Sequence, residues 1–276
     1  IYRYPRYFKN ILLYGMILSI LMPLTANAQK LNVPYVTTPP EVVDKMMEVA
    51  GVGPGDYVID LGSGDGRIVI EAARRDAVGH GLEIDSGLVR KAENNAQKAG
   101  VSDRVMFLNK DVFHGDFSRA NVITTYMTTT LHTRLRPKLL NTLEPGSLVV
   151  SHDFHMGRWK PDKHVKAGNH DIYFWVVPAT IEGRWYWHTA NKRFTMSVRQ
   201  TFQEIQLNIK ADNIALTIDK SKISGNRISF TAKNPDNGNH YAYHGVVKGI
   251  IIDGTVQIED GKEKRIESWS ATLHKQ

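Results

Sequence analysis

A glycine-rich loop flanked by carboxylates is the segment of the sequence that most clearly carries chemistry. It reads DLGSGDG over residues 60–66, overlaps the end of the short apolar run 57–61, and precedes a helical stretch over 67–75. A strand, a glycine loop and a helix in this order open a nucleotide-binding βαβ unit, because glycine lets the backbone approach a ligand closely. The dinucleotide pattern G-x-G-x-x-G fails here, since Arg67 stands in its last position. The loop therefore predicts a nucleotide-type pocket of another kind.

Apolar runs and helical repeats alternate along residues 33–178, and these elements must position the loop. Thr38 can cap a first helix that starts with Pro39 and carries Glu41 in a capping box, and Gly51 ends it. Further helices are predicted over 67–75, 87–99 and 137–143. Strands are predicted over 57–61, 80–83, 104–108, 121–127, 147–152 and 171–177. Strands separated by helices predict an α/β fold, a mostly parallel sheet with helices on both faces, whose ligands lie beyond the carboxyl ends of the strands.

The loop and the acid before it resemble the first motif of class I S-adenosylmethionine (SAM) dependent methyltransferases, an acid followed by G-x-G-x-G at the end of strand one. The resemblance implies a Rossmann-like methyltransferase sheet, SAM as cofactor, and Asp60 as the partner of its ammonium, directly or through water. Glu83 ends the second strand and can accept hydrogen bonds from both ribose hydroxyls. Asp111 ends the third, where the family places an acid against the adenine amino group. Each acid alone could be a solvated loop carboxylate, but three on successive strand ends favour a SAM site.

The flanking segments are similar to the protein-lysine N-methyltransferase family that includes the mitochondrial enzymes acting on the c subunit of ATP synthase and on the adenine nucleotide translocase, with bacterial relatives. The similar segments are residues 33–39, 60–69, 81–83, 135–140 and 149–154. The resemblance implies methyl transfer to an acceptor, expected to be a protein lysine amine. The residues it implies for cofactor binding are Tyr35, Asp60, Gly62, Ser63, Gly64, Gly66, Glu83 and Asp111.

The sequence departs from that family in two places, one of which bears on the acceptor. Thr37 stands where a proline is usual, and Thr128 and Thr129 replace the Leu-Pro often seen after strand four. The end of strand four is where the acceptor meets the methyl group in this family. The identity of the acceptor is therefore the part of the resemblance that these departures leave open.

Three polar residues near the ends of strands four and five are the catalytic candidates. Methyl transfer is an in-line displacement at a sulfonium, and an amine acceptor must also lose a proton. Tyr126 is the candidate for lining the transfer site, with simple strand-end packing as an equal alternative. His152 and Asp153 can bind the acceptor or carry its proton, although a turn acid beside a polar histidine is an equally good interpretation. His152 and His155 lack a clear third ligand, so no metal site is predicted.

Composition excludes several other chemistries. The 276 residues contain no cysteine, which removes disulfides, thiolate metal sites and covalent cytosine C5 methylation. No Asn/Asp-Pro-Pro-Tyr/Phe motif occurs at 125–127, which argues against methylation of adenine or cytosine amino groups. The 35 Lys and Arg against 28 Asp and Glu give +7, and Arg3, Arg6 and Lys9 account for three of these charges. An excess this small predicts no nucleic-acid partner.

After Pro178 the pattern changes to short alternating runs separated by turn signals such as NPDNG over 234–238. Many short strands without helices predict an antiparallel barrel or sandwich. We expect residues 181–276 to form this accessory domain and residues 29–180 to form the methyltransferase domain.

The first 28 residues have the pattern of an export signal. A basic segment precedes an apolar run over 11–24, and Ala26-Asn27-Ala28 provides a small-x-small cleavage site. We expect a periplasmic or secreted protein that begins at Gln29; an uncleaved inner-membrane anchor over 11–24 is the alternative. Because SAM is made in the cytosol, an exported non-catalytic binding or adaptor protein that retains the pocket remains the alternative function.

Overall fold

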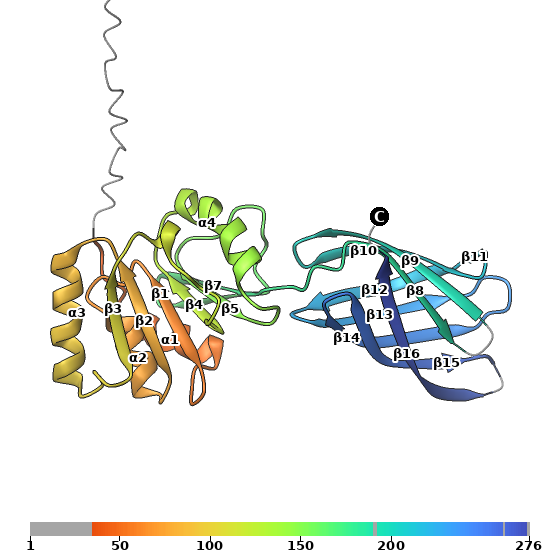
Figure 1. Cartoon of the computed structure of the whole chain (residues 1–276), viewed down its shortest axis with the longest axis horizontal. Helices are drawn as coiled ribbons and strands as arrows, with labels where there is room; N and C mark the ends of the chain where they lie inside the picture. The colour runs from red at the N-terminus through yellow and green to blue at the C-terminus, as the bar shows by residue number, and fades with distance from the viewer. Residues whose placement is uncertain (1–34, 190–191, 262, 275–276) are drawn as a thin grey trace, which may run out of the picture. The chain divides into compact units, whose positions relative to one another are not determined.

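The computed structural model describes residues 35–189, 192–261 and 263–274 (Figure 1). Within these ranges, no helix combines the length and the apolar character needed to span a membrane. The predicted export signal, its cleavage site and the membrane anchor considered as its alternative lie outside the described residues.

The first part of the chain is built on a seven-stranded sheet in the order β3-β2-β1-β4-β5-β7-β6. Its strands are β1 (Tyr57–Leu61), β2 (Val78–Glu83), β3 (Val105–Asn109), β4 (Val122–Thr125), β5 (Leu148–His152), β6 (Lys163–Ala167) and β7 (His170–Val176). β1 to β5 pair in parallel, whereas β7 runs antiparallel to both β5 and β6. This arrangement confirms the predicted mostly parallel sheet.

Helices cover both faces of this sheet, as predicted. They are α1 (Pro40–Ala50), α2 (Arg67–Arg74), α3 (Ser86–Ala99), the short 3-10 helix η1 (Val112–His114) and α4 (Thr129–Thr142). α1 and α2 pack on the face that carries Val58, Val122 and Val150, and α4 packs on the opposite face with Ile59 and Ile123. β1, β4 and β5 are buried along nearly their whole length, and because successive side chains point to opposite faces, both faces of the sheet are apolar.

Local sequence signals locate several of these elements well and misplace others. Gly51 and Gly100 end α1 and α3 in the left-handed conformation, as expected of helix C-caps. The prediction that Thr38 caps α1 is wrong: the N-cap is Pro39, and the Thr38 hydroxyl is hydrogen-bonded to a histidine instead. α4 begins at Thr129, eight residues before the predicted start, so Pro137 lies inside the helix.

The order of the strands determines where a ligand can bind. From β1 the chain continues to β2 and β3 on one side, then crosses to β4 and β5 on the other. Such a reversal leaves a crevice beyond the carboxyl ends of the strands on either side of it, here β1 and β4. The glycine loop follows β1, and Tyr126 follows β4 directly.

The second part of the chain is one nine-stranded antiparallel sheet in the order β11-β10-β9-β8-β16-β15-β14-β13-β12. Its strands are β8 (Gly183–Thr189), β9 (Lys192–Thr201), β10 (Glu204–Ala211), β11 (Ile214–Ala215), β12 (Thr217–Ser224), β13 (Arg227–Lys233), β14 (His240–Lys248), β15 (Ile251–Glu259) and β16 (Lys264–His274). The sheet curls until the Ser221 hydroxyl of β12 donates to the Ile205 carbonyl of β10, so that it nearly closes into a barrel around an apolar interior (Figure 1). The predicted all-β region is confirmed.

Candidate functional site

The glycine loop is anchored to the end of β2. The amides of Gly62 and Ser63 both donate to the carbonyl of Leu82, at 2.9 and 3.0 Å. Gly66 has a φ of 81°, and a Cβ there would lie 2.6 Å from the Phe107 ring. Because this position needs both a left-handed backbone and close packing, only glycine fits it. The loop geometry is therefore built into the packing between sheet and helices.

Glu83 occupies the last position of β2, next to the glycine loop. Its side chain is buried, and its Oε2 accepts from the amide of Gly64 at 2.9 Å while Oε1 accepts from the amide of Asp85 at 2.9 Å. These two bonds fix the carboxylate between the glycine loop and the start of α3. Each oxygen keeps acceptor capacity, which suits it to the vicinal hydroxyls of a ribose.

Asp60 lies inside β1 and is the most deeply buried acid of the site. Burial raises the pKa of Asp60 to about 7, although the Thr124 hydroxyl donates to its Oδ1 at 2.7 Å, and the nearby carboxylates of Glu83 and Asp65 raise the pKa further. The ionised form of a buried carboxylate among other acids is destabilised, and a cationic ligand would stabilise it.

The destabilised carboxylate of Asp60 fits SAM as a ligand. SAM carries a sulfonium and an ammonium, so buried acids complement its charge. Ser63 also has a buried hydroxyl for which the described part of the chain offers no hydrogen-bond partner. The chemistry of Asp60, Glu83 and the loop glycines therefore fits this cofactor.

The structure places two other expected cofactor residues less tightly. Asp111 lies two residues beyond β3 rather than at its end, where it caps η1 by accepting from the amide of Phe113 at 2.9 Å. Its side chain is 41% exposed, so one oxygen can still meet a ligand. Tyr35 is exposed and belongs to the N-terminal unit 1–35, so its role near the cofactor stays a prediction.

Beyond β4 and β5 the catalytic candidates come together in one polar cluster. The Tyr126 ring stacks on the His152 ring with centroids 3.9 Å apart and an angle of 28°. His152 is fully buried, and its Nε2 lies 3.2 Å from Asp153 Oδ2. Tyr126, His152 and Asp153 thus form a single cluster.

The cluster contains two members that sequence analysis did not assign to it. His170 Nδ1 lies 2.9 Å from His152 Nε2 and 3.0 Å from Asp153 Oδ2. The Thr38 hydroxyl lies 3.1 Å from His152 Nδ1. No local pattern marks either residue, because the contacts depend on the antiparallel pairing of β5 with β7 and on the segment before α1. His155, by contrast, accepts from the amide of Gly157 and is not a member of the cluster.

Charge is unevenly distributed in this cluster. Burial lowers the pKa of His152 to about 4, against the attraction of Asp153. Burial alone would raise the pKa of Asp153, but hydrogen bonds from His170 and from the Asp171 amide outweigh it, and this pKa is lowered. Burial, followed by the charge of Asp153, raises the pKa of Tyr126. At neutral pH the cluster therefore holds a neutral His152, an ionised Asp153 and a protonated phenol.

Comparison with known proteins agrees with this geometry. Residues 60–163 match the model of the ANTKMT methyltransferase domain. A protein-lysine N-methyltransferase of Saccharolobus islandicus is 41% identical over 154 residues, which cover 53% of this chain and 94% of that protein. The chain belongs to this methyltransferase family.

Two further relatives of this methyltransferase extend the comparison. The human lysine N-methyltransferase named for the c subunit of ATP synthase is 28% identical over 58% of this chain and 68% of its own length. A crystal structure described as an RNA methyltransferase from Salinibacter ruber in complex with S-adenosyl-L-homocysteine is 51% identical, with a TM-score of 0.52, and covers 53% of this chain and 96% of that one. The protein is thus a SAM-dependent methyltransferase, and the matches cover little more than half of the chain.

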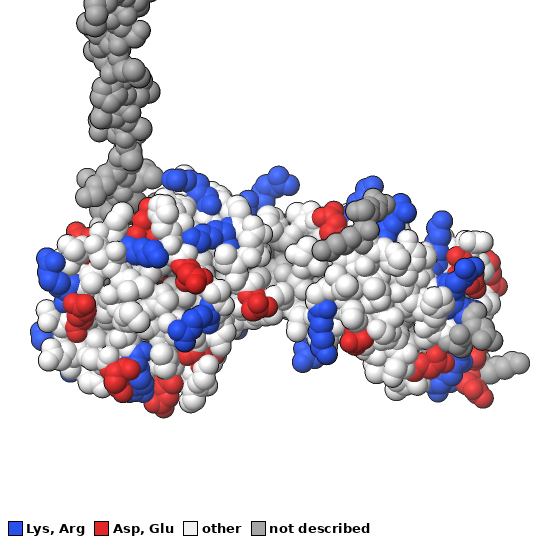
Figure 2. Space-filling view, in the orientation of Figure 1, with Lys and Arg blue, Asp and Glu red and all other residues white. Residues whose placement is uncertain are grey.

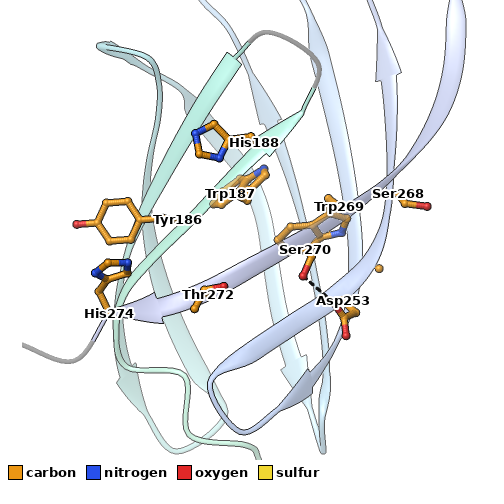
Figure 3. Close-up of a pocket in the computed structure, with 10 residues that line it drawn as sticks. Tyr186, Trp187, His188, Asp253, Ser268, Trp269, Ser270, Thr272 and His274 are labelled. Atoms are coloured by element: carbon orange, nitrogen blue, oxygen red, sulfur yellow. Dashed lines mark hydrogen bonds between the residues drawn. The ribbon is translucent and has the colours of Figure 1, made fainter.

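The antiparallel sheet of the methyltransferase has a cleft of its own. β16 pairs with β8 only through its last residues, 272–274, and beyond them the two strands part (Figure 3). The opening, about 720 Å³, is lined by Trp187, Trp269 and polar side chains that include Ser270, which donates to Asp253 at 2.7 Å. All of its lining residues come from β8, β15 and β16, and none from the SAM pocket.

Proposed function

We propose that this methyltransferase transfers the methyl group of SAM to the side-chain amine of a protein lysine. The observation that carries the proposal is the match along 94% of the Saccharolobus islandicus protein, which is named as a protein-lysine N-methyltransferase. The relatives named for lysine methylation of the ATP synthase c subunit and of the adenine nucleotide translocase support the same acceptor class.

Two groups of residues would bind the two reactants, one the cofactor and the other the acceptor amine. Asp60, Glu83, Asp111 and the glycine loop would hold SAM, which supplies a methyl group made electrophilic by its sulfonium. Tyr126 offers an aromatic ring, a feature that binds an ammonium. Alignment of the amine with the methyl group, and exclusion of water, are the main contributions that such a site makes to the rate.

A lysine amine must lose a proton before it can attack the methyl group. The polar cluster of Thr38, Tyr126, His152, Asp153 and His170 lies at the carboxyl ends of β4 and β5 and is the group of side chains suited to take this proton. A proton received there can pass outward, because His170 and Asp153 are partly exposed.

RNA is the competing acceptor, since a relative carries that description. Over the face shown in Figure 2, Lys and Arg side chains are interspersed with Asp and Glu rather than gathered in one basic area. A surface that follows a phosphate backbone needs clustered positive charge. The distribution of charge on this face therefore favours a protein acceptor.

The test is transfer of a radiolabelled methyl group from SAM into a lysate of the producing cells. We expect label that survives ribonuclease, disappears when lysines are first blocked by acetylation, and maps to methyl-lysine by mass spectrometry. The variant Glu83→Ala is the inactive control, and Glu93→Ala, an exposed acid on α3, is the matched active one. Label that is lost on ribonuclease treatment would show RNA to be the acceptor and overturn the proposal.

We further propose that the protein is exported. The basic segment, the apolar run 11–24 and the Ala26-Asn27-Ala28 site support this proposal. Sequencing the N-terminus of the protein recovered from the cell envelope or medium tests it: Gln29 is expected for a cleaved signal, and an intact N-terminus in the membrane fraction indicates an anchor. Recovery in the cytosol alone would contradict export.

A further inference from the structure

Three potential metal ligands converge on one point beside the proposed acceptor site. They are Nε2 of His152 at the end of β5, Oδ2 of Asp153 in the next residue, and Nδ1 of His170 at the start of β7. The three atoms are 2.9, 3.0 and 3.2 Å apart, so they form a nearly equilateral triangle. Within the described residues, this is the one group of three or more His, Asp or Glu side chains that meets the geometry of a metal site.

Hydrogen bonds alone account poorly for this triangle. If the Nδ1 proton of His152 is donated to the Thr38 hydroxyl, Nε2 presents a lone pair to the other two atoms. A single proton on His170 Nδ1 must then serve both His152 and the Asp153 carboxylate. Two of the three contacts would be satisfied at most, whereas one cation at the common point satisfies all three.

We propose that His152, Asp153 and His170 bind a divalent transition-metal ion through one face of its coordination sphere. Neighbouring ligand atoms of an octahedral ion at about 2.1 Å lie about 3.0 Å apart, which matches the observed triangle. Two imidazoles and one carboxylate on one face are the ligand set of sites that keep their remaining positions open. The imidazoles favour iron, cobalt, nickel or zinc over magnesium or calcium.

The surroundings of the three ligands are those of a built site. The Thr38 contact orients the His152 ring, the role that hydrogen-bonded outer partners have around metal-binding histidines. Asp153 adopts a left-handed φ of 57°, and its Oδ1 accepts from the amide of Asp171 at 2.8 Å, which leaves Oδ2 for the ion. Aspartate is one of the few residues other than glycine that adopt this left-handed conformation readily.

Neighbouring charged groups do not compete for this position. The Asp171 carboxylate is engaged by His164 at 2.7 Å and by Lys166 at 2.8 Å. Tyr126 stacks on the His152 ring through its aromatic face. The open positions of the ion would therefore be filled by water.

A metal-bound water gives this site a role in the reaction, a role that rests on the proposed lysine acceptor. A divalent ion lowers the pKa of its water, so a bound hydroxide is available near neutral pH. The hydroxide takes a proton from the lysine ammonium, which leaves a neutral amine and a metal-bound water. The N–H bond breaks, an O–H bond forms, and no group is oxidised or reduced.

Metal binding to the full chain, stripped with a chelator, tests the site directly. Titration with Co²⁺ should give visible absorption that saturates at one ion per chain, and calorimetry with Zn²⁺ should give the same stoichiometry. His170→Ala and Asp153→Asn should each weaken Zn²⁺ binding at least 100-fold. His155→Ala and His164→Ala remove histidines near the triangle but outside it, and should change affinity less than threefold. Millimolar Mg²⁺ should not compete.

SAM binding to the same metal-free proteins separates this inference from the proposed function. The affinity for SAM should change less than twofold in His170→Ala, which also shows that the variant is folded. Absence of stoichiometric Zn²⁺ and Co²⁺ binding by a chain that binds SAM would overturn the metal site and leave the methyltransferase. Metal binding that His170→Ala does not weaken would overturn it equally. Methyl-lysine formation unaffected by complete metal removal would overturn the role of the bound water while the binding site stands.

Discussion

The carboxyl ends of the parallel strands and the interior of the antiparallel sheet differ in the side chains that they bury. At the carboxyl ends of the parallel strands, Asp60, Glu83 and His152 are ionisable, nearly inaccessible, and held by specific partners. Inside the antiparallel sheet the buried side chains are mostly apolar, and neither Trp187 Nε1 nor the Tyr243 hydroxyl makes a hydrogen bond of good geometry to a described residue. Burial of the ionisable groups lowers the free energy of unfolding, whereas burial of the apolar side chains raises it.

This contrast teaches where to look for function in the chain. A charged group that is buried and still held by hydrogen bonds has been kept at a cost in free energy, which chemistry or ligand binding can explain. Aromatic rings such as Trp187, Phe230 and Trp269, packed 5.3 to 5.9 Å apart, are explained by packing alone. Substitutions in the two regions should accordingly affect different measurements.

The largest expected effect is on stability, in the antiparallel sheet. Trp269 is 3% exposed and packs against Trp187, Phe230 and Tyr243. Trp269→Ala should lower the free energy of unfolding by about 3–5 kcal/mol, because it removes a large side chain and leaves a cavity. Urea denaturation followed by fluorescence measures the change, with Trp269→Phe as a milder control. SAM affinity should stay within twofold; a large loss of it would contradict the division of roles between the two regions.

Next in size is loss of cofactor binding at Glu83. Glu83→Ala removes the acceptor that holds the Gly64 amide and would remove the two charge-assisted hydrogen bonds expected to the ribose. We expect SAM affinity to fall by more than about 100-fold, since each such bond contributes about 1.5–3 kcal/mol. Calorimetric titration of SAM measures it, with Glu93→Ala as the control that keeps full affinity. An unchanged affinity in Glu83→Ala would mean that the pocket is elsewhere.

A pH dependence of SAM binding should follow from Asp60. Because its pKa in the folded chain is about 7, the carboxyl is increasingly protonated below that pH and cannot pair with the SAM ammonium. SAM affinity should therefore fall as pH decreases from 7.5 to 5.5, by up to about tenfold for each pH unit below 7. Titrations across this range test it, and Asp60→Asn should bind weakly with no such slope. A slope that persists in Asp60→Asn would assign the proton to another group.

Stability has the opposite dependence on the same proton. The folded-state pKa of Asp60 is raised above its usual value of 3.8, so between about pH 4 and 7 the folded chain binds more protons than the unfolded chain. The stability that the protonated carboxyl contributes is present below pH 4 and is lost as the pH rises through 7. Asp60→Asn should consequently be more stable than the parent at pH 8, which urea denaturation can measure.

The smallest effect is expected at Asp111. Its side chain is 41% exposed and would supply one hydrogen bond to the adenine amino group. Asp111→Ala should weaken SAM binding about fivefold to tenfold, or about 1–1.4 kcal/mol. Asp103→Ala, another exposed acid near β3, is the matched control. Equal affinities of the two variants would remove Asp111 from the cofactor site.

Sequence periodicity predicted the central strands of the parallel sheet but did not predict its outermost strand, β6. β1 and α3 carry apolar residues at regular spacing, and both were placed within a residue of their bounds. β6 was not predicted, because its sequence KHVKA is half polar and only one of its faces is covered. The start of α4 was misplaced because Pro137 was taken as a first helical residue, although the helix accommodates it internally.

The sequence by itself determined the glycine loop and the placement of the acids around it, because strand, glycine turn and helix are adjacent in the chain and each acid occupies a strand end or the loop that follows. Only the tertiary structure decided the composition of the polar cluster. Thr38 and His152 are 114 residues apart, and His170 reaches His152 through the antiparallel pairing of β5 with β7. Hydrogen bonds and metal coordination act over about 2–3 Å, so side chains far apart in sequence acquire this chemistry only when the fold brings their atoms together.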